Sequence, residues 1–139
     1  MANVMLNIKG SHREVGGEED VMELITTGTI EKVDNDFVLE YDEGELSGMG
    51  DTLTRIKIKD DCVHLERVGD MSTEFVFYES RAFEGLYTTP LGTINVSIFP
   101  TNISTNVSED EGVVDLQYEI KVAGVAALNK LNISYKVKN

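Results

Sequence analysis

The stretch that decides the fold is Tyr41–Lys59, YDEGELSGMGDTLTRIKIK, in which one strand runs into a glycine-rich break and a second strand follows it. The glycines Gly44, Gly48 and Gly50 fall within seven residues, and such a density is costly in a regular strand. The backbone is therefore expected to bend or bulge here, as a barrel requires at its corners. In the following strand, Thr52–Lys59, apolar and hydroxyl side chains alternate with arginine and lysine.

Alternation with a period of two extends from this pair of strands over the whole chain, and no segment has the 3.6-residue period of a helix. One-sided burial of this kind is typical of an antiparallel sandwich or barrel. We predict an all-β fold, a single antiparallel barrel of about eight to ten strands formed by residues 1–139. The expected strands are 2–9, 21–33, 37–42, 52–59, 62–68, 73–78, 83–87, 94–98, a short piece at 103–107, 114–122 and 131–137.

The breaks between strands follow turn chemistry. Ser11–Asp20, SHREVGGEED, and Ala123–Lys130 are predicted to be loops, and Pro100 is predicted to end a strand because it lacks an N–H. Asp34–Asp36 supplies short side chains that tolerate a left-handed turn. Gly28, inside a long strand, predicts a bulge or a close backbone approach.

The composition is that of an acidic globular protein. The 139 residues carry a formal net charge of -13, with 41% hydrophobic and 27% charged residues. Such a charge repels nucleic acid and anionic membrane surfaces, so neither is expected as a partner. Its simplest role is to keep the protein soluble.

Cysteine usage and the lack of a leader indicate the cytoplasm. Cys62 is the only cysteine, so no disulfide forms within the chain and no CxxC motif holds zinc. The first residues, MANVMLNIKG, lack the features of a signal peptide, and no apolar run reaches the roughly 20 residues of a membrane helix. We therefore expect a cytoplasmic protein without a cofactor.

Several stretches of the sequence match a known family: Tyr41–Lys59, Val63–Gly69, Phe75–Phe77 and Tyr87–Gly92, and more weakly the last two alternating strands. The most specific parts are Glu45–Met49 and the turn Thr89–Gly92. In these parts the chain resembles the YwiB-like bacterial proteins, a family of unknown function with a calycin-type (lipocalin-like) β-barrel. The resemblance implies a closed or nearly closed antiparallel barrel, and it supplies no activity and no catalytic residues.

A barrel of this size is filled by its own side chains or holds one small ligand. The first hypothesis is that a small apolar molecule binds in the interior, and a self-filled core is the more common alternative. The expected inward set is Phe37, Leu39, Tyr41, Ile56, Ile58, Phe75, Phe77 and Tyr118.

Arg67 breaks the apolar face of its strand, where it follows Val63 and Leu65. A buried guanidinium needs an acidic partner, and Glu43 is the candidate. Arg67 either anchors the acid group of a ligand at the barrel mouth or closes one end as a structural clamp, and we favour the clamp. The candidate ligand-binding residues are Arg67, Tyr41, Glu43, Phe75, Phe77 and Tyr118.

Cys62, His64 and Glu66 lie two apart on one strand face and are candidate zinc ligands, with His12 as a more distant addition. This spacing on a single strand is weak evidence, and we favour a solvated face and predict no metal. Cys62 and His64 also lack the third group of a nucleophile–base pair. The acidic runs around Glu40–Glu45 and Glu109–Glu111 are interpreted as exterior charge.

We therefore expect a non-enzymatic cytoplasmic barrel that binds a small apolar or acid-bearing ligand in its interior. The alternative is a structural or interaction module with a self-filled core that contacts another protein or forms a homodimer. A cavity with Arg67 at its mouth would favour binding, whereas a solid core with an outer apolar patch would favour the interaction module.

Overall fold

The computed structural model of the protein describes residues 2–42, 52–69, 72–78, 81–89, 92–122 and 124–138. The predicted bends at Gly44, Gly48 and Gly50 lie outside these residues, as do Pro90 and Leu91 of the Thr89–Gly92 turn. The elements are β1 (Ala2–Glu14), β2 (Asp20–Val33), β3 (Asp36–Asp42), β4 (Thr52–Ile58), β5 (Cys62–Gly69), β6 (Ser72–Tyr78), β7 (Phe83–Thr89), β8 (Gly92–Val107), β9 (Glu111–Val122) and β10 (Val125–Val137).

The ten strands form one closed antiparallel barrel. Each strand pairs with the next along the chain, and β1 pairs with β10 to close the ring. The predicted all-β antiparallel barrel is therefore confirmed. No helix long and apolar enough to cross a membrane occurs in the part of the chain that the structure describes.

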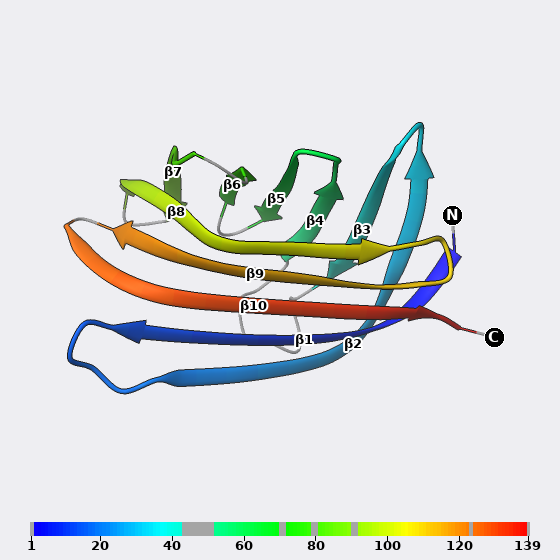
Figure 1. The fold of residues 1–139 in the computed structure, drawn as a ribbon, viewed down its shortest axis with the longest axis horizontal. Helices are drawn as coiled ribbons and strands as arrows, with labels where there is room; N and C mark the ends of the chain where they lie inside the picture. Colours follow the sequence, from blue (N-terminus) through cyan, green and yellow to red (C-terminus); the bar gives the residue numbers. More distant parts are fainter. Residues whose placement is uncertain are drawn as a thin grey trace.

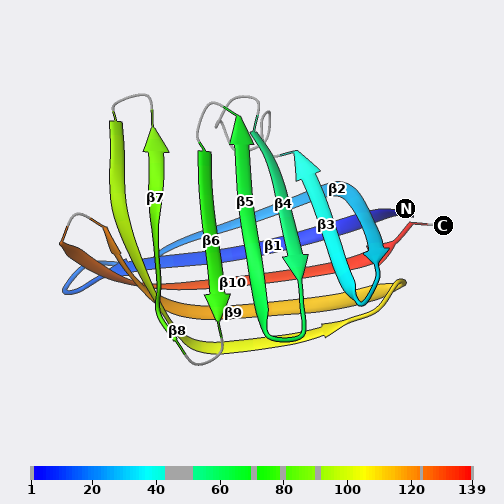
Figure 2. The same cartoon turned by 90° about the horizontal axis from the view of Figure 1, so that it is seen from above.

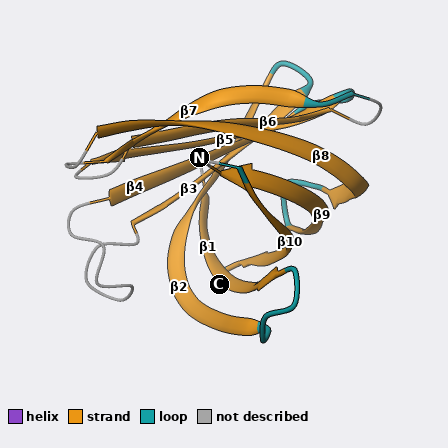
Figure 3. Cartoon of the chain, turned by 90° about the vertical axis from the view of Figure 1, so that its left-hand side faces the viewer, coloured by secondary structure: helices purple, strands orange, loops and turns teal. Residues whose placement is uncertain are grey.

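The barrel is flattened into two layers whose strands cross. Strands β3 to β7 run across the direction of β1, β9 and β10, as Figures 1 and 2 show, and the end view of Figure 3 shows the two layers curving into each other. Strands β2 and β8 belong to both layers, because each pairs with a short strand over one half and a long strand over the other. Such corners need a local break in the sheet.

The break in β8 corrects one prediction. Pro100 does not end the strand, which continues to Val107, and the register with β9 shifts between Pro100 and Asn102. Because proline has no N–H to donate, a bulge is one of the few positions it can take within a sheet. Thr101 is the bulged residue between these two pairs, and its hydroxyl donates a hydrogen bond to the carbonyl oxygen of Gln117 at 3.0 Å.

Gly28 makes the corner in β2, where pairing with β1 and with β3 overlaps. A Cβ added at Gly28 would overlap the carbonyl oxygen of Glu40 and lie 2.7 Å from Leu6 Cδ1 and 3.1 Å from Tyr41 Cβ. The predicted close backbone approach is confirmed, because only a residue without a side chain fits here.

Two predicted loops are shorter than expected. Ser11–Glu14 continues β1 and Asp20 already belongs to β2, so the first loop is only residues 15–19. Val125–Lys130, also predicted to be loop, is the first half of β10. These two segments pair with each other, from Ser11 opposite Lys130 to Glu14 opposite Ala127, and this mutual pairing makes strands of residues with little strand preference. The turn at Asp34 is as predicted, with a left-handed φ of 56°.

The alternating side chains fill the interior as predicted. Leu39, Ile56 and Phe77 have no exposed surface, and Leu116, Tyr118 and Ile120 all point inward from β9. The whole predicted inward set is buried, except that Phe37 is partly exposed while still packed against the core.

The shortest described strand pairing in the barrel is the one between β6 and β7. Among the described residues these strands pair at only two positions, Ser72 opposite Thr88 and Thr73 opposite Tyr87. Neighbouring strands pair over six residues or more.

Candidate functional site

One end of the barrel holds a cavity of about 510 Å³. It lies at the end where β1 turns into β2 and β9 turns into β10, on the left in Figure 1. Its apolar lining consists of Val21, Met22, Leu65, Phe75, Ile94, Val96, Ile120, Val122 and Leu131. Its polar lining consists of Ser11, His12, Asp20, Arg67, Tyr118, Asn129 and Lys130, with Gly10 beside them.

The floor of the cavity is aromatic. The Phe77 and Tyr118 rings lie 4.8 Å apart between centroids, and Phe75 meets Phe77 edge to face at 6.4 Å. Phe77 is fully buried and Tyr118 is 9% exposed. Phe75 and Tyr118 line the cavity, and the fully buried Phe77 ring packs against both of them.

Three polar side chains form a row on the inner face of β1, β10 and β9. His12 is directly opposite Asn129, and Asn129 is directly opposite Tyr118. His12 Nδ1 lies 2.6 Å from Asn129 Oδ1, and because an amide oxygen only accepts, Nδ1 carries the proton. Asn129 Nδ2 donates to the Tyr118 hydroxyl over 3.5 Å. The row is thus a hydrogen-bonded chain that leads from the rim to the floor.

Arg67 adds a positive charge to the opposite wall, which β5 supplies. It follows Val63 and Leu65 on the inner face, as predicted, and lines the cavity with Tyr118. Burial raises the pKa of the Tyr118 phenol, while the hydrogen bond from Asn129 and the charge of Arg67 lower it by less. Tyr118 therefore keeps its proton at neutral pH and acts as a hydrogen-bonding group.

Some of the predicted ligand-binding residues line the cavity and others do not. Arg67, Phe75 and Tyr118 line the cavity, and Phe77 supports it from below. Tyr41 is buried against Gly28, in the corner formed by β2 and β3, and is not among the lining residues. Glu43, the proposed partner of Arg67, lies outside the described residues.

Sequence reasoning missed His12 and Asn129 as cavity residues. Both lie on the segments that were predicted to be loops. The alternation pattern could have identified both residues. His12 is an even number of residues from the inward-facing Leu6 and Ile8, and Asn129 is an even number of residues from Leu131 and Ile133.

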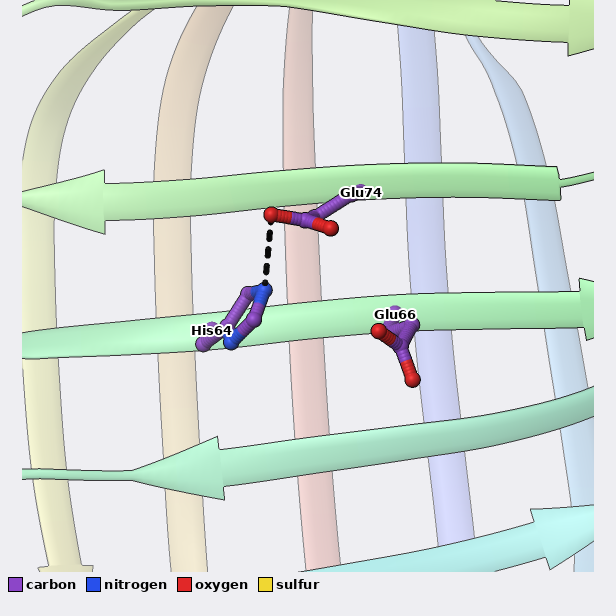
Figure 4. Close-up of side chains that lie close together, drawn as sticks. All are labelled: His64, Glu66 and Glu74. Atoms are coloured by element: carbon purple, nitrogen blue, oxygen red, sulfur yellow. Dashed lines mark ion pairs between the residues drawn. The ribbon is translucent and has the colours of Figure 1, made fainter.

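A second cluster of functional side chains lies outside the barrel, on β5 and β6. It consists of His64, Glu66 and Glu74, whose ligating atoms all lie within 4.8 Å of one another. Figure 4 shows His64 Nε2 directed at Glu74, 3.4 Å from its Oε1 atom. His64 and Glu66 were paired with Cys62 in the sequence-based candidate; the structure adds Glu74 from the neighbouring strand.

An outer groove of about 540 Å³ runs over β1, β10 and β9. Its lining includes Met5, Ile25 and Val113, which are 42%, 59% and 44% exposed, and Tyr135. The buried Oδ1 atom of Asn7, also in the groove, has no hydrogen-bond partner. The groove therefore combines exposed apolar side chains with polar ones.

A ten-stranded antiparallel barrel closed by its first and last strands, with a cavity at one end, fits the calycin-like class. The chain belongs to the family described as Domain of unknown function (DUF1934), whose model matches residues 6–133. The predicted resemblance to the YwiB-like proteins is thereby confirmed.

The fold is similar to that in the crystal structure of the ywiB protein from Bacillus subtilis. The TM-score is 0.88 at 21% sequence identity, and the match covers 99% of this chain and 93% of that chain. At this identity the likeness concerns the fold alone. No curated protein matches the chain.

Proposed function

We propose that this protein is a non-enzymatic binding protein that holds a small molecule with an apolar body and an acidic group in the end cavity of its barrel. The observation that carries the proposal is the cavity of about 510 Å³, in which apolar walls surround Arg67, Tyr118, Asn129 and His12. Ligand pockets in proteins typically measure about 300–1,000 Å³ and combine apolar walls with a few converging polar groups.

The cavity offers each part of such a molecule a suitable surface. The apolar body lies against Leu65, Phe75 and Ile120, where its removal from water contributes about 25 cal/mol per Å² of buried apolar area. The acidic group lies near Arg67, whose planar guanidinium bonds a carboxylate in a bidentate manner. The Tyr118 hydroxyl accepts from Asn129 and so directs its own proton to the ligand.

The polar groups recognise a ligand and do not suit catalysis. Because burial raises the pKa of Tyr118, its phenol stays protonated at neutral pH and is not available as a base. Hydrogen bonding in the row His12–Asn129–Tyr118 fixes the three side chains in place. The formal net charge of -13 supports a role without nucleic acid or an anionic membrane surface. A cytoplasmic location, supported by the single cysteine, is part of the proposal.

Two fluorescent probes of similar shape test the proposal. One is 8-anilinonaphthalene-1-sulfonate, which carries an acid group, and the other is the uncharged N-phenyl-1-naphthylamine. We expect both to bind the wild-type protein, and Arg67→Met to weaken the sulfonate about tenfold or more while leaving the uncharged probe within about twofold. Arg81→Met is the matched control, because Arg81 stacks on Tyr78, 3.9 Å from its ring centroid, and does not line the cavity.

Equal binding of the sulfonate to wild type and Arg67→Met would refute the role of Arg67. Failure of both probes to bind, or binding that survives Leu65→Trp, a substitution that fills the cavity, would refute binding in the interior. Native mass spectrometry of protein purified from its own cell then identifies the molecule that copurifies and counts the subunits.

The second candidate function is a structural or interaction module, which the outer groove with Met5, Ile25 and Val113 favours. In this case the groove is the contact surface of a homodimer. Analytical ultracentrifugation distinguishes the two functions, because a dimer that dissociates on Ile25→Glu supports the interaction module, and a monomer at all concentrations contradicts it.

A further inference from the structure

The outer face of β5 and β6 carries two carboxylates at directly opposed positions. Glu66 on β5 is the cross-strand partner of Glu74 on β6, and His64 is the preceding outward residue on β5. Like charges at opposed positions destabilise a sheet, so a cation near both carboxylates stabilises this arrangement. Figure 4 shows the three side chains together on the outer face.

The neighbouring strands neutralise only part of this charge. Arg55 on β4 lies 3.5 Å from Glu66 through Nη1 and 3.0 Å from Glu40 through Nε. With His64 neutral, the three carboxylates Glu40, Glu66 and Glu74 outweigh the guanidinium of Arg55 and the ammonium of Lys57, which lies opposite His64 on β4, by one negative charge. A bound cation offsets this remaining charge.

The imidazole of His64 is placed as a metal ligand. Its Nε2 atom is buried and has no hydrogen-bond partner, although it lies 3.4 Å from Glu74 Oε1. Two ligands at about 2.1 Å from one tetrahedral ion are separated by about 3.4 Å, so these two atoms already have the required spacing. The side chain of Glu74 is 60% exposed, which leaves the site open to solvent on this side.

We propose that His64, Glu66 and Glu74 form a binding site for a divalent transition-metal ion of the Zn²⁺ type. The imidazole nitrogen and two carboxylates are three protein ligands, and water takes the fourth position. Arg55 remains paired with Glu66 and holds this ligand in orientation, as outer partners of metal ligands do. The sequence alone favoured a solvated face here, and the ligand that it could not supply is Glu74, which β6 brings beside His64.

This site is independent of the cavity, so its test is independent of the proposed ligand. Metal-free protein is titrated with ZnCl₂ in a calorimeter, and the visible absorption of the Co²⁺-loaded protein reports the coordination geometry. We expect one Zn²⁺ per chain and the intense bands of tetrahedral Co²⁺. His64→Gln and Glu74→Gln are each expected to weaken Zn²⁺ binding about tenfold or more and to abolish these bands.

Two control variants define the ligand set. Glu109→Gln removes an exposed carboxylate from the turn between β8 and β9, and Cys62→Ser removes the thiol that precedes His64 on the same strand face. Both are expected to bind Zn²⁺ like the wild type. The far-ultraviolet circular dichroism of each metal-free variant verifies that it is folded.

Three results would overturn the proposal. The first is a wild-type protein that binds no Zn²⁺, and the second is a folded His64→Gln or Glu74→Gln variant that binds it with unchanged affinity. The third is loss of binding in Cys62→Ser, which would give the thiol the role assigned here to a carboxylate.

Discussion

Replacing Gly28 by alanine tests the corner at which β2 passes from one layer to the other. The added methyl group meets the carbonyl oxygen of Glu40, Leu6 Cδ1 at 2.7 Å and Tyr41 Cβ at 3.1 Å. Ordinary contacts of a Cβ atom are 3.4–4 Å, and Glu40 presents backbone that cannot rotate away. Strand β2 must therefore move away from β3 in the register that pairs Gly28 with Tyr41.

The loss of unfolding free energy in Gly28→Ala has two contributions. Overpacking of a well-filled interior costs about 1–3 kcal/mol, and weakening one buried ladder hydrogen bond costs about 1 kcal/mol more. We therefore expect Gly28→Ala to lower the free energy of unfolding by about 3 kcal/mol. For a chain of this length this corresponds to a fall in Tm of about 6–12 °C.

Gly10→Ala on β1 is the matched control. Its added Cβ meets Met22 Cγ, in a flexible side chain, at 3.4 Å, and its next contact is at 3.8 Å. Because alanine also restricts the unfolded chain, we expect this variant to lie within about 1 kcal/mol of the wild type. Urea unfolding followed by circular dichroism measures both variants. A loss for Gly28→Ala no larger than that for Gly10→Ala would show that the corner relaxes freely and that the reasoning is wrong.

Three further predictions concern the core, the phenols and the thiol. Phe77→Ala, at a fully buried ring, should lower the free energy of unfolding by about 3–5 kcal/mol, whereas Phe99→Ala, at a ring 47% exposed, should change it by less than about 1 kcal/mol in the same urea assay. Burial raises the pKa of Tyr118 and Tyr135 above the ordinary value of 10.0, so the unfolded chain releases these protons first as pH rises. The free energy of unfolding should therefore be constant up to about pH 10 and decline above it. The decline should be shallower in Tyr118→Phe, and an equal decline in this variant would contradict the role of the phenol. Burial, and to a smaller extent the charge of Asp61, raises the pKa of the Cys62 thiol. Iodoacetamide at pH 8 should therefore alkylate the folded protein more slowly than the urea-unfolded protein, and equal rates would contradict this.

The period-two pattern was enough to predict the class of fold, because one-sided burial fixes which side chains face inward. The pattern did not predict strands whose residues have little strand preference and that form only because neighbouring strands pair with them. Ser11–Glu14 and Val125–Lys130 contain few β-branched or aromatic residues, and they are strands because they pair with each other and, on their other sides, with β2 and β9. Pro100 likewise suggested an end, whereas the sheet accommodated it as a bulge.

The same limit explains the incomplete prediction of the candidate site. Arg67, Phe75 and Tyr118 lie on strongly alternating strands, so their inward direction could be predicted. His12 and Asn129 lie on the two misassigned segments, and the hydrogen-bonded row they form was therefore missed. Glu74 could not be joined to His64 without the register of β5 and β6, which the sequence does not supply.

The ladder between β1 and β10 has a consequence for biosynthesis. It joins the first of the ten strands to leave the ribosome with the last, from Val4 opposite Val137 to Glu14 opposite Ala127. Until β10 has been translated, β1 exposes one unsatisfied edge, and this edge is the kind of surface on which nascent chains aggregate. Formation of the row His12–Asn129–Tyr118 is thus delayed until the last strand arrives, and a chain interrupted before β10 has neither a closed wall nor the polar side of its cavity.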